Sequence, residues 1–273
     1  MIALLCATPR EMSCLKGFTE KSADRYCPHG MSMIEARAGD RKLLILACGV
    51  GKVAAASATM HLIDSHPVEL LINFGTAGAL SPIPRIGDIV IATELIQGDV
   101  GIAHSRGFKT TGPGLCERGE IVFSPSYRTE PALVQRAEET ASGNGIPYHR
   151  GKVLTCDQVV LDSKLRSHLG DRFDALAVEM EGAASAQVAL GEGLPFLAIR
   201  AISDDITHDF VDLEKVLPRQ GQSRLHLWGK RFLLSVTHPS AIARARDLSR
   251  GTDAALSNLA AFIEVLLERG LDA

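Results

Sequence analysis

The 273-residue sequence lacks the features that mark several large classes of proteins. It contains no run of about 18 apolar residues without a charge, so no segment is expected to span a membrane. It has no excess of positive charge, because 29 Lys and Arg residues stand against 32 Asp and Glu residues and the formal net charge is −3. A weakly acidic chain has no general attraction for phosphate backbones, which argues against nucleic acid as a partner. The apolar opening over residues 1–7 lacks a basic lead-in and is too short for a secretion signal, so we expect a cytoplasmic protein.

Paired cysteines are also absent. The six cysteines stand singly and no Cys-x-x-Cys occurs, so the sequence carries no signature of a zinc site or a redox pair. Single cysteines in apolar runs usually act as small hydrophobic residues, and we expect that role here. We therefore predict neither a bound metal nor a cofactor.

Short apolar runs alternate with helical segments along the chain. Six runs have the length of a strand and are apolar on both faces: residues 2–7, 43–47, 68–74, 89–92, 176–178 and 196–202. Four segments have helical spacing: residues 52–65, 131–143, 181–193 and 252–269. Strands that are apolar on both faces suit a sheet covered by helices on both sides. The sequence therefore predicts the α/β class, with a three-layer αβα sandwich around a mixed, mostly parallel sheet.

No internal repeat or low-complexity linker divides the chain, so we expect residues 1–273 to form a single domain. Two stretches interrupt the alternation. Residues 97–120 are rich in glycine and are predicted to be a long loop, and residues 205–250 are polar with several Pro and Gly breakers. Long loops in compact domains are often lids or subunit contacts, although a surface insertion without a role fits the sequence equally well.

A glycine-rich turn, Gly49-Val50-Gly51-Lys52-Val53-Ala54, follows a predicted strand and opens a predicted helix. Its letters match the dinucleotide-binding motif, but that motif needs an acidic residue at the end of the next strand. The next strand ends in Asn73-Phe74-Gly75, which has no carboxylate. A tight turn into a closely packed helix is therefore favoured over a dinucleotide site.

A second small-residue motif, Gly75-Thr76-Ala77-Gly78, closes the strand over residues 68–74. In an open parallel sheet, ligands lie at the carboxyl ends of the strands. Small residues at such an end let backbone N–H groups and a hydroxyl approach a ligand. Thr76, Ala77 and Gly78 are therefore candidate binding residues, although the motif alone would also fit a plain turn.

Acidic side chains follow three of the predicted strands. They are Glu11, Glu179, Glu181 and Asp204, and the last of these strands also carries Arg200. A parallel sheet brings these strand ends to one rim, where several acids with one arginine suit general acid–base chemistry. Each acid alone would more often be a helix cap or a first-turn residue. Together with the small-residue motif, they make a site the favoured interpretation.

Four motifs in order resemble the nucleoside phosphorylase/nucleosidase superfamily. They are Gly49-Val50-Gly51-Lys52-Val53-Ala54-Ala55, Gly75-Thr76-Ala77-Gly78 with Ile86-Gly87-Asp88-Ile89-Val90, Val178-Glu179-Met180-Glu181-Gly182-Ala183-Ala184, and Arg200-Ala201-Ile202-Ser203-Asp204. The chain most resembles the 5′-methylthioadenosine/S-adenosylhomocysteine nucleosidases, relative to which residues 205–250 are an insertion. Ala7-Thr8-Pro9-Arg10-Glu11 and Asp99-Val100-Gly101 also resemble futalosine hydrolases.

The resemblance implies hydrolysis of the N-glycosidic bond of an adenosine-type nucleoside through an oxocarbenium-like state. In that scheme Asp204 is the general acid that protonates the purine at N7. Glu181 is the acid that binds the ribose hydroxyls, and Glu11 is the acid that orients the attacking water. Futalosine hydrolases usually have Asn where this chain has Asp204, which favours a purine that needs N7 protonation.

The resemblance also implies a set of residues around these acids. Met180 would lie against the sugar, Glu179 and Arg200 would steady that corner, and Ser203 is counted among the binding residues. Val159 and Val160 match the position of the base pocket. Residues 97–120, from the same or a neighbouring subunit, would cover the 5′ end of the nucleoside, whose substituent stays open. We expect a homodimer or a higher homo-oligomer.

Phosphorolysis is the nearest alternative to hydrolysis. A phosphorylase must bind a dianionic phosphate, for which arginine is the natural ligand. The resembled phosphorylases have arginine at two positions where this chain has Glu11 and Asn73, and a carboxylate would repel phosphate. Water is therefore the favoured nucleophile, with Arg10 and Arg85 left as candidate phosphate ligands. A phosphate-dependent purine nucleoside phosphorylase, a futalosine hydrolase and a non-catalytic nucleoside-binding protein remain the alternatives.

Overall fold

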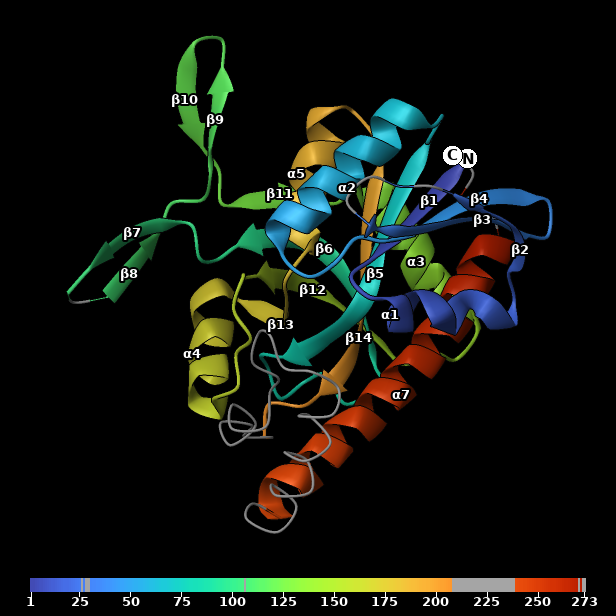
Figure 1. The fold of residues 1–273 in the computed structure, drawn as a ribbon. Helices are drawn as coiled ribbons and strands as arrows, with labels where there is room; N and C mark the ends of the chain where they lie inside the picture. Colours follow the sequence, from blue (N-terminus) through green and yellow to red (C-terminus); the bar gives the residue numbers. More distant parts are fainter. Residues whose placement is uncertain (26, 28–29, 106, 208–238, 270, 272–273) are drawn as a thin grey trace.

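In the described residues, a ten-stranded mixed sheet forms the centre of the structure, and helices cover both of its faces (Figure 1). The computed structural model describes residues 1–25, 27, 30–105, 107–207, 239–269 and 271. The strand order is β11-β6-β12-β13-β5-β1-β4-β3-β2, and β14 pairs with both β5 and β6. The fold class predicted from the sequence is confirmed.

The strands of this sheet are β1 (Ile2–Cys6), β2 (Glu20–Arg25), β3 (Ser32–Ala38), β4 (Arg41–Ala47), β5 (Leu70–Ala79), β6 (Ile89–Gln97), β11 (Ser126–Arg128), β12 (Tyr148–Thr155), β13 (Ala175–Glu179) and β14 (Phe196–Asp204). The helices are α1 (Pro9–Cys14), the short 3-10 helix η1 (Leu15–Gly17), α2 (Lys52–Ser65), α3 (Pro131–Gly143), α4 (Ser163–Phe173), α5 (Gly182–Gly191) and α7 (Pro239–Glu268).

Parallel pairing holds the strands whose ends form the candidate site. β1 pairs in parallel with β4 and β5, β14 with β5, and β12 with β6 and β13. Antiparallel pairs join β2 to β3, β3 to β4, β11 to β6, β13 to β5 and β14 to β6. Among the described residues, five strand pairs of this sheet are parallel and five are antiparallel, so the sheet is mixed as predicted, with a larger antiparallel share than expected. β13 and β14 both pair with β5, in opposite directions, and this pairing brings their carboxyl ends together.

Two hydrophobic cores lie on opposite faces of the sheet, because successive strand residues point to opposite sides. In β1, Ile2 and Leu4 pack on the side of α3 and α7, whereas Ala3 and Leu5 pack on the side of α2 and α5. The apolar stripe predicted for the last helix is buried in the first core: Ala255, Leu256, Leu259, Phe262, Ile263, Leu266 and Leu267. None of the helices in the described part of the chain has the length and hydropathy that a membrane crossing requires.

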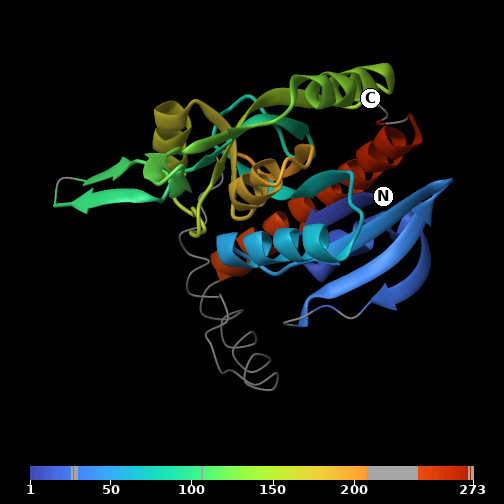
Figure 2. The same ribbon diagram turned by 90° about the horizontal axis from the view of Figure 1, so that it is seen from above.

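The predicted long loop at residues 97–120 is wrong in detail. This stretch and the three residues after it form two hairpins, β7 (Gly101–His104) with β8 (Gly107–Thr110) and β9 (Gly114–Glu117) with β10 (Glu120–Phe123). Strands of four residues between glycines are too short to give a clear periodic signal. Figures 1 and 2 show that β7 and β8 project away from the body of the molecule.

The last helix is longer than predicted, because α7 begins at Pro239 and not at residue 252. Pro fits the first turn of a helix, and Gly251 continues the helix where it passes β14. A Cβ atom at Gly251 would lie 2.2 Å from the Ser203 carbonyl oxygen, so a glycine allows this close contact. Of the predicted insertion at 205–250, residues 208–238 lie outside the described residues.

Candidate active site

A cavity of about 240 Å³ opens at the carboxyl ends of β1, β5, β13 and β14. Its lining includes all the site residues predicted from the sequence except Arg200: Glu11, Thr76, Ala77, Gly78, Val159, Val160, Glu179, Met180, Glu181, Ser203 and Asp204. Residues from distant parts of the chain therefore meet at one place, as the strand-end argument predicts. Val160 is buried in this wall, whereas the Val159 side chain is exposed.

Glu11 is fixed at the rim by hydrogen bonds to both of its carboxylate oxygens. The Thr8 backbone N–H (2.9 Å) and hydroxyl (3.0 Å) donate to Oε2, and the Thr76 N–H (3.0 Å) and hydroxyl (3.3 Å) donate to Oε1. Thr8 and Glu11 form a capping box at the start of α1. The side chain therefore has the helix-capping role and also lines the cavity. A Cβ atom at Gly75 would lie 2.8 Å from Oε1, so that glycine makes room for the carboxylate.

Arg200, beneath the cavity, forms a buried ion pair with Glu179 of the cavity wall, with 2.5 Å between Nη2 and Oε2. Both side chains are about 2% exposed. Arg200 also donates to the backbone oxygen of Asn73 (3.0 Å) and to its side-chain oxygen. Glu179 accepts hydrogen bonds from the backbone N–H groups of Glu181 (3.0 Å) and Gly182 (2.7 Å), at the start of α5. The pair therefore fixes the turn on which Glu181 stands.

Glu181 precedes the first turn of α5 but makes no side-chain capping bond there. Its Oε1 instead accepts from the backbone N–H of Gly51 (2.8 Å), in the glycine-rich turn before α2. Burial, followed by the negative charge of Glu179, raises the pKa of Glu181 to about 7. Gly51 has φ +99°, a conformation that favours glycine. The turn that resembles a dinucleotide motif therefore serves to hold this acid.

Asp204 is the last residue of β14 and is 6% exposed. The Ser203 hydroxyl donates to its Oδ1 (2.6 Å), and Arg166 Nη1 lies 2.5 Å from its Oδ2. A Cβ atom at Gly78 would lie 3.0 Å from the same oxygen, so the carboxyl group is enclosed on several sides. Asp204 therefore faces the cavity as a buried acid between a hydroxyl and a guanidinium group.

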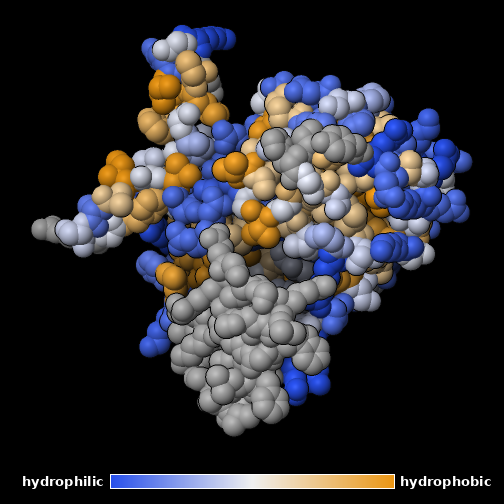
Figure 3. All heavy atoms as spheres, viewed as in Figure 1, coloured by the Kyte–Doolittle hydropathy of each residue, from blue (hydrophilic) through white to orange (hydrophobic). Residues whose placement is uncertain are grey.

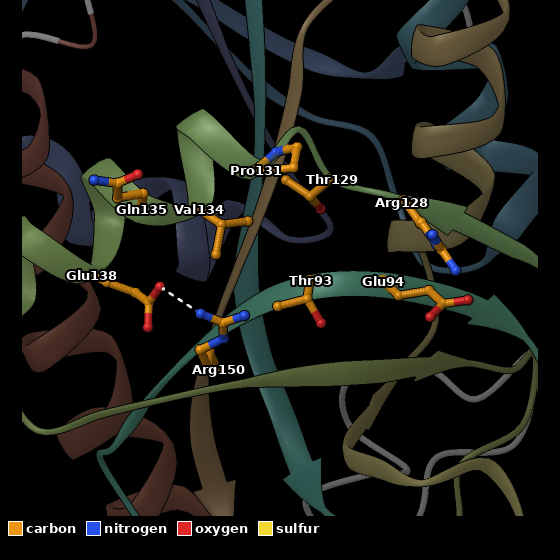
Figure 4. A pocket seen from close by; sticks show the side chains of 9 residues that line it. All are labelled: Thr93, Glu94, Arg128, Thr129, Pro131, Val134, Gln135, Glu138 and Arg150. Atoms are coloured by element: carbon orange, nitrogen blue, oxygen red, sulfur yellow. Dashed lines mark hydrogen bonds and ion pairs between the residues drawn. The ribbon is translucent and has the colours of Figure 1, made fainter.

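A larger cavity of about 530 Å³ lies elsewhere, between β6, β11, β12 and α3 (Figure 4). It contains an ion pair between Arg150 and Glu138 (3.2 Å) but shares no lining residue with the first cavity. The described residues contain no group of three or more His, Cys, Asp or Glu side chains arranged to hold a metal ion. The convergence of buried acids, and not size, therefore identifies the smaller cavity as the candidate site.

Comparison with known proteins places the chain in a family. The family model of the Phosphorylase superfamily matches residues 1–225. The chain belongs to this superfamily. A 5′-methylthioadenosine/S-adenosylhomocysteine nucleosidase of Geobacillus kaustophilus is 33% identical over 204 residues, which cover 74% of this chain and 83% of that protein. A nucleosidase of the same name from Mycobacterium tuberculosis is 30% identical over 217 residues, covering 74% and 85%.

Solved structures share the fold of this superfamily member. A mutant of the Helicobacter pylori nucleosidase, with 5′-methylthioadenosine in its active site, has a TM-score of 0.73 at 22% identity and covers 98% of both chains. The native futalosine hydrolase of Helicobacter pylori has the same TM-score and identity and covers 98% of this chain and 97% of its own. The resemblance stated from the sequence motifs is confirmed.

The two arginines considered as phosphate ligands do not line the cavity of this superfamily member. Arg10 Nη2 lies 2.7 Å from Asp253 Oδ1 on α7 and also contacts Ser249. Asn73, at the second position where the resembled phosphorylases have arginine, contacts Arg200 below the cavity. Among the residues that the structure describes, the guanidinium group that lines the cavity is that of Arg166, which the sequence motifs do not include. No local pattern marks it, because the sequence predicts no helix over the residues of α4.

Proposed function

We propose that this chain is a purine nucleoside N-ribosyl hydrolase. Its substrate class is an adenosine-type nucleoside of the 5′-methylthioadenosine/S-adenosylhomocysteine kind, and water is the nucleophile. One observation carries the proposal: Glu11, Glu181 and Asp204 line a single cavity from three different elements. The names of the relatives in the same superfamily support the substrate class.

Each of the three acids has a separate role in the displacement of the purine by water. Asp204 transfers its proton to N7 of the purine while the C1′–N9 bond breaks, and the bonding electron pair leaves with the base. Water adds to the oxocarbenium-like C1′ and gives its proton to the Glu11 carboxylate. Glu181 accepts hydrogen bonds from the ribose hydroxyls. The products are a free purine and a free sugar, and no cofactor is required.

The charges around the cavity favour water over phosphate. The Glu11 carboxylate stands in the cavity wall, where it would repel a dianion. Arg10 is engaged with Asp253, and Arg166 is paired with Asp204. In the described part of the chain, a phosphate would therefore meet a carboxylate, while these two guanidinium groups are engaged with acidic side chains.

Replacement of Asp204 by asparagine tests the general acid. Asp204→Asn should lower kcat by on the order of 10²–10⁴-fold, because the lost proton transfer belongs to the transition state. KM should change far less. Release of adenine from 5′-methylthioadenosine measures both constants. Asp64→Asn, an exposed change on α2, is the matched control. Turnover near that of the unmodified protein would show that Asp204 is not the acid.

A panel of nucleosides, with and without phosphate, tests the function as a whole. Adenosine, 5′-methylthioadenosine, S-adenosylhomocysteine, inosine and futalosine are each incubated in phosphate and in a phosphate-free buffer. We expect release of adenine with a free sugar at equal rates in both buffers. A sugar 1-phosphate that forms only with phosphate would instead identify a phosphorylase. Binding without cleavage of any member would identify a nucleoside-binding protein, and cleavage of futalosine alone would identify the futalosine hydrolase alternative.

We also propose a homodimer or higher homo-oligomer in which the hairpins at residues 97–120 cover the 5′ end of the nucleoside. The hairpins project from the body and carry exposed apolar side chains (Figure 3), among them Ile102 (57% exposed), Ile121 (59%) and Phe123 (61%). Arg172 of α4 donates to the Phe108 carbonyl (2.7 Å), which places β8 beside the helix that carries Arg166. Apolar groups exposed in this way are typical of contact surfaces.

Shortening each hairpin in turn tests this role. Removal of residues 102–109 or of residues 115–122 should change the preference among 5′ substituents more than the cleavage of plain adenosine. Light scattering of each variant should show weaker association. The proposal would be contradicted if shortening lowered the cleavage rate equally for all 5′ groups and the protein were a monomer both before and after shortening.

The remaining expectations concern the whole chain. We infer that residues 1–273 act as one domain with an insertion at 205–250, and that the enzyme works in the cytoplasm. The six cysteines are unpaired, which suits a reducing compartment. Limited proteolysis into two stable halves, or recovery of the protein outside the cytoplasm after cell fractionation, would contradict these inferences.

A further inference from the structure

Arg166 is a buried cation in contact with the proposed general acid. Its side chain is about 4% exposed, and its Nη1 lies 2.5 Å from Asp204 Oδ2. The same Nη1 donates to the Asp205 carbonyl (3.2 Å), and Nε donates to the Val160 carbonyl (2.8 Å). One guanidinium group therefore connects the end of β14 with the segment that forms the base side of the cavity.

The position of α4 makes this contact possible. Its N-terminus is capped by Asp162, whose carboxylate accepts from the Leu165 N–H (2.7 Å). One turn after Arg166, a Cβ atom at Gly170 would lie 2.1 Å from the Leu80 carbonyl oxygen. Only a glycine lets the helix sit this close to the end of β5. The resulting approach carries Arg166 into the cavity wall, next to Asp204.

Burying a guanidinium group costs desolvation free energy, which packing alone does not offset. Removing an arginine from water is repaid only when its geometry and hydrogen bonds are good, and a well-packed apolar residue often stabilises a fold as much. The Arg166 guanidinium contacts Asp204, the carbonyl of its neighbour Asp205 and the Val160 carbonyl of the base segment. The contacts therefore fit a role in the reaction better than a role in the core.

We propose that Arg166 is a positioning residue for the glycosidic cleavage, acting through Asp204. It holds the Asp204 carboxyl group in one orientation and stabilises the carboxylate that remains when the proton passes to N7. This inference rests on the proposed role of Asp204 as general acid. It assigns a function to a residue that the sequence motifs do not include.

The physical reason is a difference between two states of the same carboxyl group. As the proton moves to the purine, negative charge develops on the carboxyl oxygens beside a guanidinium group that is already in place. An interaction that strengthens in this way lowers the barrier, so it acts on kcat rather than on substrate binding. The hydrogen bond from Arg166 Nε to the Val160 carbonyl holds the base segment of the cavity in a fixed position relative to Asp204.

Substitution at Arg166 tests the proposal, with Lys164→Met as the control that removes an exposed cation from the same helix. Arg166→Met should lower kcat by roughly 10²-fold, as for the loss of other preorganised groups that stabilise developing charge, while KM changes little. Arg166→Lys keeps the charge and should recover part of kcat. Urea unfolding of each variant checks that the fold is intact. A kcat for Arg166→Met equal to that of Lys164→Met would overturn the proposal.

A double-mutant cycle separates this role from a merely structural one. If Arg166 acts through Asp204, Arg166→Met should cost almost nothing further in the Asp204→Asn background. Losses that multiply would show that Arg166 acts independently of the acid and would overturn the inference. If the unmodified protein releases no base from any nucleoside, the proposed function itself fails. If the unmodified protein cleaves nucleosides and the Arg166→Met variant is equally active, the role of Arg166 is refuted and the proposed function stands.

Discussion

The buried ion pair between Arg200 and Glu179 is the interaction on which the site depends. Arg200 stands in β14, Glu179 ends β13, and these strands pair with β5. Arg200 also contacts Asn73 of β5, so one cation joins three strands beneath the cavity. Buried charges persist only when they are paired and hydrogen-bonded, and this requirement fixes the strands relative to one another.

This ion pair fixes the positions of the acids above it. Glu179 accepts from the N–H groups of Glu181 and Gly182, which sets the first turn of α5. A Cβ atom at Gly182 would lie 2.4 Å from the Leu95 side chain and 3.1 Å from Arg200 Nη2, so a larger residue there would displace these side chains. Glu181 is then directed toward the cavity. Its raised pKa follows from burial first and from the neighbouring Glu179 charge second.

The sequence predicts those parts of the protein that depend on local pattern. The bounds of α2 and α3 follow from helical spacing and a first-turn proline, and the acids were found because they follow apolar strands. The hairpins at residues 97–120 and the start of α7 were missed, because short strands and a polar helix turn carry little periodic signal. Arg166 could not be predicted, since its role depends on how closely Gly170 lets α4 approach Leu80, which is a contact between distant segments.

A double-mutant cycle on the Arg200–Glu179 pair, measured as the free energy of unfolding in urea, tests this account most directly. Arg200→Met should cost about 3–5 kcal/mol, because it leaves a buried carboxylate without its cation. Combining it with Glu179→Gln should restore part of that loss, since the remaining side chains carry no charge. Losses that add, or an Arg200→Met variant as stable as the unmodified protein, would show that this ion pair does not hold the site together.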